Sequence, residues 1–189
     1  MLCNTFAMPA PSLTTKRLLL RQWETRDFPL FQEINADPRV MEHFPSPLSK
    51  QESDFLAQKI QKELEEKDYG LWAIEVPGVF PFTGFVGLHY QDFPSAFTPC
   101  IEIAWRLGYD YWGRGYAKEA AKKAIDYAFK TLKLDLLVAF TTPSNKRSWG
   151  LMEKLGMTHD PKDDFYHPKL PKDHPLGFHV LYKLKNPFQ

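Results

Sequence analysis

A strand, a glycine turn, a helix and a second strand follow one another between residues 101 and 141, and this succession constrains the fold most. Ile101–Leu107 is typical of a strand and Ala117–Leu132 of a helix. Leu134–Thr141 is an almost unbroken apolar run, as in strands that are buried on both faces. The pattern predicts a βαβ unit with a right-handed crossover, and hence at least one pair of parallel strands.

The turn of this unit, Trp112–Ala117, is suited to binding a phosphate. Gly113 and Gly115 permit a tight turn at positive φ, and the amides at the start of the following helix have no intrahelical acceptor. A dinucleotide-binding turn would have a third glycine where this chain has Lys118, and no Gly-Lys-Ser/Thr follows as in a P-loop. The turn alone predicts an anion site, or merely a connection between strand and helix, without naming the ligand.

The remaining sequence predicts one α/β (α+β) domain built around this unit. Asp27 is a suitable N-cap, and Phe55, Leu56, Ile60 and Leu64 would share the buried face of one helix. Further strands are expected at 17–21, 71–76, 85–90 and 178–184, and further helices at 28–36, from Ser49 or Ser53 to about Lys67, and at 146–155. We expect a mixed, twisted sheet of six to seven strands with about four helices, in a domain spanning 13–189 after a loose tail, 1–12.

Composition narrows the range of partners. The net charge is +1, from 24 basic and 23 acidic residues, which argues against a nucleic-acid partner. No apolar run approaches the roughly 20 residues of a membrane span, and no signal peptide is evident. The two cysteines, Cys3 and Cys100, form no metal-binding or disulfide pattern. We therefore expect a cytoplasmic protein that binds neither membrane nor metal.

Four segments together carry a resemblance to a known family. They are Thr14–Arg21, Ile101–Trp105, Tyr111–Ala120 and Asn145–Met157. In this order they resemble the opening strand, the central strand, the acetyl-CoA signature and the following helix of the GNAT N-acetyltransferase superfamily. The likeness covers roughly residues 14 to 184 and is closest to the ribosomal-protein N-acetyltransferase-like branch. None of the four segments is specific alone, but jointly they are.

The resemblance implies that acetyl-CoA is the co-substrate, without a metal, and that the central parallel strands splay apart. The pyrophosphate would then lie on the amides of the glycine turn and the pantetheine along the edge of the central strand. Asn145 matches the family position that reaches the pantetheine, and it also suits the N-cap of its helix. The implied cofactor-binding residues are Trp105, Arg106, Leu107, Trp112, Gly113, Arg114, Gly115, Tyr116, Ala117 and Asn145.

Acetyl transfer to an amine needs a base for the amine and a donor for the departing thiolate. The resemblance makes Glu102 the candidate base, although a strand residue facing outward would look the same. Many members of the family carry a tyrosine acid where this chain has Met152, which cannot donate a proton. Ser148 is the alternative acid, or an ordinary serine in a first helical turn. His167 is a candidate acid or base on the substrate side.

The implied activity is that of an acyltransferase. An acetyl group would pass to a primary amine, either a protein N-terminus or a small amine such as an amino acid or polyamine, by direct attack in a ternary complex. The alternatives are a transferase of another acyl-CoA, a module that binds acyl-CoA without turnover, and a nucleotide-binding enzyme. By analogy with the superfamily, a homodimer is also considered.

Overall fold

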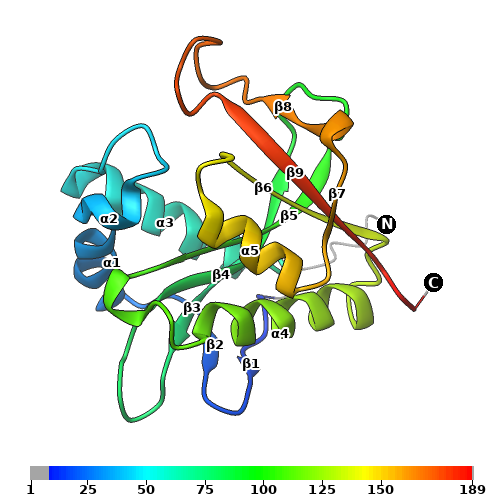
Figure 1. Cartoon of the computed structure of the whole chain (residues 1–189). Coiled ribbons are helices and arrows are strands. Elements are labelled where there is room, and N and C mark those ends of the chain that lie inside the picture. The colour runs from blue at the N-terminus through cyan, green and yellow to red at the C-terminus, as the bar shows by residue number, and fades with distance from the viewer. Residues whose placement is uncertain (1–8, 189) are drawn as a thin grey trace, which may run out of the picture.

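The computed structural model describes residues 9–188 and contains a mixed sheet with helices against it (Figure 1). The sheet order is β1-β2-β3-β4-β5-β6-β9-β7, and β8 also pairs with β9. The strands are β1 Leu13–Thr14, β2 Leu19–Arg21, β3 Leu71–Glu75, β4 Gly84–Gln91, β5 Cys100–Leu107, β6 Leu136–Thr141, β7 Thr158–His159, β8 Phe165–Tyr166 and β9 Phe178–Lys185. The helices are α1 Asp27–Ala36, α2 Pro38–Met41, α3 Lys50–Glu66, α4 Tyr116–Lys130 and α5 Lys146–Lys154.

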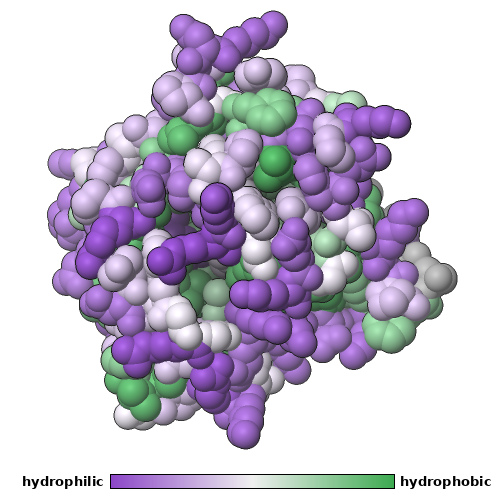
Figure 2. Space-filling view, viewed as in Figure 1, coloured by the Kyte–Doolittle hydropathy of each residue, from purple (hydrophilic) through white to green (hydrophobic). Residues whose placement is uncertain are grey.

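The predicted fold class is confirmed, with more strands than expected. The additional strands β1, β7 and β8 are two residues long. So short a run carries no alternation that a sequence pattern could reveal. In Figure 1, α1, α2 and α3 gather on one side of the molecule, apart from α4 and α5. Figure 2 shows that the face turned to the viewer is mainly hydrophilic, with apolar residues in small separate patches.

The two central strands diverge as predicted. β5 pairs with β4 in antiparallel fashion along its whole length, from Gln91↔Cys100 to Gly84↔Leu107. Its parallel ladder with β6 consists of the single pair Glu102↔Val138. Beyond Glu102 the edge of β5 that faces β6 is therefore not paired with β6 in the ladder. A ligand with its own amide groups can pair with such an edge.

Helix α4 lies close to the sheet because its buried side is made of small residues. Ala120, Ala121, Ala124 and Ala128 are fully buried, whereas the preceding Ala117 is only partly buried. The close approach sets the start of α4 near the end of β5, with a short 3-10 helix, Tyr109–Tyr111, and the glycine turn between them. The alanine pattern thus places the glycine turn at the mouth of the gap between β5 and β6.

Two predictions about the helices were wrong. Asp27 is not an N-cap: its carboxylate accepts from the Arg21 guanidinium at 2.7 and 2.9 Å, and it is fully buried in the first turn of α1. Phe55 does not face the core, since 71% of it is exposed. The buried side of α3 is instead set by Ser53, whose hydroxyl accepts from the Asn35 side chain at 2.9 Å. Both errors arise from polar partners on other elements.

Helix α3 begins with a complete capping box. The Ser49 hydroxyl accepts from the Glu52 amide, and the Glu52 carboxylate accepts from the Ser49 amide at 2.8 Å. Replacing Ser49 with Ala should lower the free energy of unfolding by about 1 kcal/mol, measured by urea denaturation. Ser46→Ala in the same exposed loop is the control, because no hydrogen bond of the Ser46 side chain occurs among the described residues. Equal stability of the two variants would show that the box contributes nothing.

The predicted tail, residues 1–12, lies mostly outside the described residues. Its described end contacts the domain: Ala10 is buried and its amide donates to the Leu64 carbonyl at 2.8 Å. The Pro11 carbonyl accepts from the Trp72 indole at 2.9 Å. Among residues 9–188, no helix is long and apolar enough to cross a membrane.

Candidate active site

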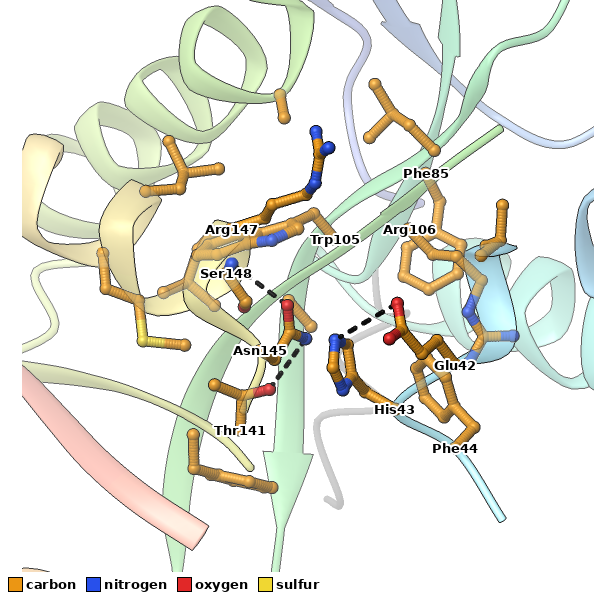
Figure 3. Close-up of a pocket in the computed structure, with 18 of the residues that line it drawn as sticks. Glu42, His43, Phe44, Phe85, Trp105, Arg106, Thr141, Asn145, Arg147 and Ser148 are labelled. Atoms are coloured by element: carbon orange, nitrogen blue, oxygen red, sulfur yellow. Dashed lines mark hydrogen bonds and ion pairs between the residues drawn. The ribbon is translucent and has the colours of Figure 1, made fainter. Parts of the chain in front are cut away.

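A cavity of about 970 Å³ runs from the glycine turn, past the divergent ends of β5 and β6, to the segment that joins α2 to α3. Figure 3 shows its wall, with side chains from β5, the start of α5 and residues 42–44 turned toward one space. The predicted residues that line it are Glu102, Trp105, Arg106, Leu107, Trp112, Gly113, Gly115, Tyr116, Ala117, Asn145, Ser148 and His167. Segments far apart in the sequence therefore form one continuous site.

The glycine turn presents a row of free backbone donors. Gly113 and Gly115 have φ of 73° and 79°, the left-handed region that side chains disfavour. In the described chain, the amides of residues 113–118 have no acceptor, and the helical ladder begins with the Glu119 amide bonded to the Gly115 carbonyl. Six consecutive free amides at the start of a helix are suited to an anion such as a phosphate.

Side chains from elsewhere hold the turn in place. Arg17 donates to the Arg114 carbonyl at 3.0 Å and forms an ion pair with Glu119 at 2.7 Å. The Trp112 indole donates to the Leu107 carbonyl at 2.8 Å, which ties the turn to the end of β5. The predicted cofactor residue Arg114 does not line the cavity: its side chain donates to the Asp110 carbonyl and lies over the Phe80 ring. Arg114 thus contributes its backbone to the turn.

Asn145 caps α5 and orients the first turn of that helix toward the cavity. Its Oδ1 accepts from the Ser148 amide at 3.2 Å, and its Nδ2 donates to the Thr141 hydroxyl at 3.0 Å (Figure 3). Ser148 uses its backbone for this cap, and no hydrogen bond of its hydroxyl occurs within residues 9–188. Met152, one turn later, is 2% exposed. The Ser148 hydroxyl therefore lines the cavity without a hydrogen-bond partner among the described residues.

Glu102 stands where the ladder between β5 and β6 ends. Its carboxylate accepts from the Gln91 side chain at 2.6 Å, and its cross-strand neighbour on β4 is His89. Burial raises the pKa of Glu102 to about 7, although the Gln91 hydrogen bond and the charges of His89 and Lys169 oppose the rise. Near neutral pH the carboxyl group therefore exists in both protonation states, as a group that transfers protons should.

An aromatic wall closes the cavity on the side of β8 and β9. The His167 ring lies 4.8 Å from Phe93 and 5.3 Å from His179, measured between centroids. Burial and the neighbouring His179 and Lys169 lower the pKa of His167 to about 4. His167 is thus neutral near pH 7, so it can contact or orient an acceptor but is not charged there.

Sequence reasoning named Arg106 only as part of the strand edge that binds the cofactor, and it missed His43 altogether. The Arg106 guanidinium lies 4.2 Å from the Phe44 ring and donates to Asn35 on α1 at 2.6 Å. His43 lies 3.8 Å from Glu42 (Figure 3), and its ring also lies 3.3 Å from the Ser144 hydroxyl. Their partners are up to 101 positions away in the chain, so no local pattern could reveal them. Within the described part of the chain, no cluster of His, Cys, Asp and Glu could hold a metal ion.

Comparison with known proteins identifies relatives of the whole domain. Residues 17–158 match the family model described as "Acetyltransferase (GNAT) domain". Two proteins of Bacillus subtilis (strain 168) are similar in sequence. "Uncharacterized N-acetyltransferase YnaD" is 29% identical over 85% of this chain and 88% of that protein, and "Uncharacterized protein YkkB" is 33% identical over 77% and 84%. A crystal structure of an acetyltransferase from Agrobacterium tumefaciens str. C58 superposes with a TM-score of 0.74 at 28% identity, covering 96% of this chain and 98% of that one.

Proposed function

The chain belongs to the GNAT acetyltransferase family, and from this premise we propose that it moves the acetyl group of acetyl-CoA to a primary amine by direct attack in a ternary complex. One observation carries the proposal. Six free amides at the start of α4 adjoin the edge of β5 that is not paired with β6. A carboxyl group with a pKa of about 7, that of Glu102, lies where this edge begins. The row of amides suits the phosphates, the edge suits a ligand with amides, and the carboxyl group suits a proton transfer.

The residues present fit the co-substrate. The free amides of residues 113–118 would hold the pyrophosphate, and the edge of Trp105, Arg106 and Leu107 would pair with the pantetheine. Asn145 retains one N–H beyond its two observed hydrogen bonds, which it would offer at the same edge. When bound, acetyl-CoA supplies a thioester carbonyl that is activated toward amines.

Glu102 would accept the proton of the attacking amine. Only a neutral amine has the lone pair that attacks a carbonyl, so an ammonium acceptor must first lose a proton. Gln91 holds one carboxylate oxygen at 2.6 Å and leaves the other free to take that proton, directly or through a water. No covalent intermediate on the protein is needed, since the amine and the thioester would be bound together.

Ser148 would protonate the departing thiolate. Replacing Ser148 with Ala should lower kcat about 100-fold, the low end of general acid–base effects. The cap of α5 uses only the Ser148 amide, so Ala leaves that hydrogen bond intact. Release of free CoA thiol measures kcat, and circular dichroism checks the fold. A variant with the wild-type kcat would remove Ser148 from the mechanism.

The proposed activity is tested by thiol release from acetyl-CoA across a panel of amino acids, polyamines and N-terminal peptides. Acetylation of at least one amine class, with weaker use of longer acyl-CoAs, is expected. Tight CoA binding without acetylation of any amine would indicate a binding module. Tight binding of ATP or NAD without binding of CoA would contradict the reading of the glycine turn.

A further inference from the structure

Arg106 is a charged side chain without a charged partner. Arg21 and Arg39, by contrast, pair with carboxylates at short range, with Asp27 at 2.7 Å and with Asp37 at 2.6 Å. No carboxylate of the described residues lies within 4.0 Å of Arg106, and its Nε is buried without a hydrogen-bond partner. Glu42, in the same cavity wall, is 71% exposed and faces His43. Burial alone lowers the pKa of Arg106, to about 10.

The N–H donors of Arg106 that have no partner lie on one edge of the guanidinium, the edge with which arginines bind carboxylates. Nη1 donates to Asn35, which fixes the plane of the group, and the Phe44 and Phe85 rings lie 4.2 and 5.7 Å from its central carbon. Nη2 and Nε make no hydrogen bond within the described chain. These two atoms form the parallel pair of N–H donors that binds a carboxylate in bidentate fashion. An anion entering the cavity would satisfy both.

Arg106 shares a face of β5 with the proposed base. Side chains alternate along a strand, so Glu102 and Arg106, four positions apart, point to the same side, about 13 Å apart at Cα. Their cross-strand neighbours His89 and Phe85 also line the cavity. One molecule bound along this face of the cavity can therefore present its amine to Glu102 and a carboxylate to Arg106.

We propose that the acceptor is a primary amine that carries a carboxylate, as a free amino acid does, and that the Arg106 side chain binds this carboxylate. The inference rests on the proposed function and specifies its substrate class. A polyamine would bring only positive charge to an unpaired guanidinium, which is unfavourable. The backbone of Arg106 can pair with the co-substrate at the same time, because the strand edge and the side chain face different directions.

The test compares each acceptor with its own carboxamide. Free α- and ω-amino acids, their carboxamides and spermidine are acetylated with acetyl-CoA, and kcat/KM is measured for each. The wild type should prefer the best acid over its amide by about 10- to 100-fold, the range for a charge-assisted pair. Arg106→Gln should reduce this ratio to near one, without changing KM for acetyl-CoA. Arg39→Gln, which removes an arginine already paired with Asp37, should keep the ratio.

Several outcomes would overturn the proposal. The proposal is overturned if the wild type acetylates the carboxamides or spermidine with a kcat/KM equal to or above that of the acids. This holds even if Arg106→Gln fails to fold. A ratio retained in Arg106→Gln, or an effect confined to KM for acetyl-CoA, would assign Arg106 to another ligand. If no amine is acetylated, the proposed function fails, and calorimetric titration of the same acids and amides into the CoA-bound protein decides the carboxylate site separately. Preference for acids in that titration supports it, and equal binding of acids and amides contradicts it.

Discussion

Replacing Gly113 with Asp is expected to weaken CoA binding by about 100-fold or more. A carboxylate about 4 Å from a phosphate costs about 4 kcal/mol at an effective dielectric constant of about 20, before screening by salt. Gly113 is the better position for this test than Gly115, because a side chain at Gly115 would meet the Arg17 guanidinium at 3.3 Å and be neutralised there. Nothing lies within 4 Å of a Cβ at Gly113.

Gly113→Asn is the matched control for charge. Asn and Asp are nearly isosteric, and both tolerate the left-handed conformation better than other side chains, so the backbone strain is shared. Calorimetry with CoA at low salt should show a modest loss of CoA affinity for Gly113→Asn and a large loss for Gly113→Asp. Thermal melting of both variants checks that the fold is retained. If the two variants bind CoA equally well, the phosphates do not lie on this turn.

Replacing Glu102 with Gln is expected to lower kcat by about 100- to 10,000-fold, the contribution of a positioned general base. Because the pKa of Glu102 is about 7, the wild-type rate should rise with pH through that value as the carboxyl group loses its proton. The rising limb near pH 7 should be absent from the variant. The further rise at alkaline pH, from titration of the acceptor amine itself, should remain in both proteins.

A change at Gln91 separates the base from a merely structural carboxylate. The Gln91 hydrogen bond favours the charged form of Glu102 and so lowers its pKa. Gln91→Met, of similar size, should therefore move the limb to higher pH while retaining most of the activity above it. If the rise of the rate with pH stays near pH 7 in Gln91→Met, or is still present in Glu102→Gln, the proton transfer belongs to another group.

Local patterns predicted the glycine turn and the start of α3 well. The glycines at 113 and 115 were expected at positive φ and adopt it, and Ser49, one of the two serines expected there, is the N-cap of α3. Each of these features depends on residues within a few positions of one another. The prediction that the parallel strands splay came from the family resemblance, and the single pair Glu102↔Val138 confirms it.

The sequence by itself determined the βαβ unit and a glycine turn whose amides suit an anion, because backbone conformation and helix capping are decided by neighbours in the chain. Only the tertiary structure decided what surrounds the reacting groups. The raised pKa of Glu102 comes from burial, and Arg106 lies unpaired between Asn35 and Phe44, which precede it by 71 and 62 positions. Burial and charge pairing depend on distance in space, which no local pattern encodes, and these two properties set the proposed acceptor chemistry.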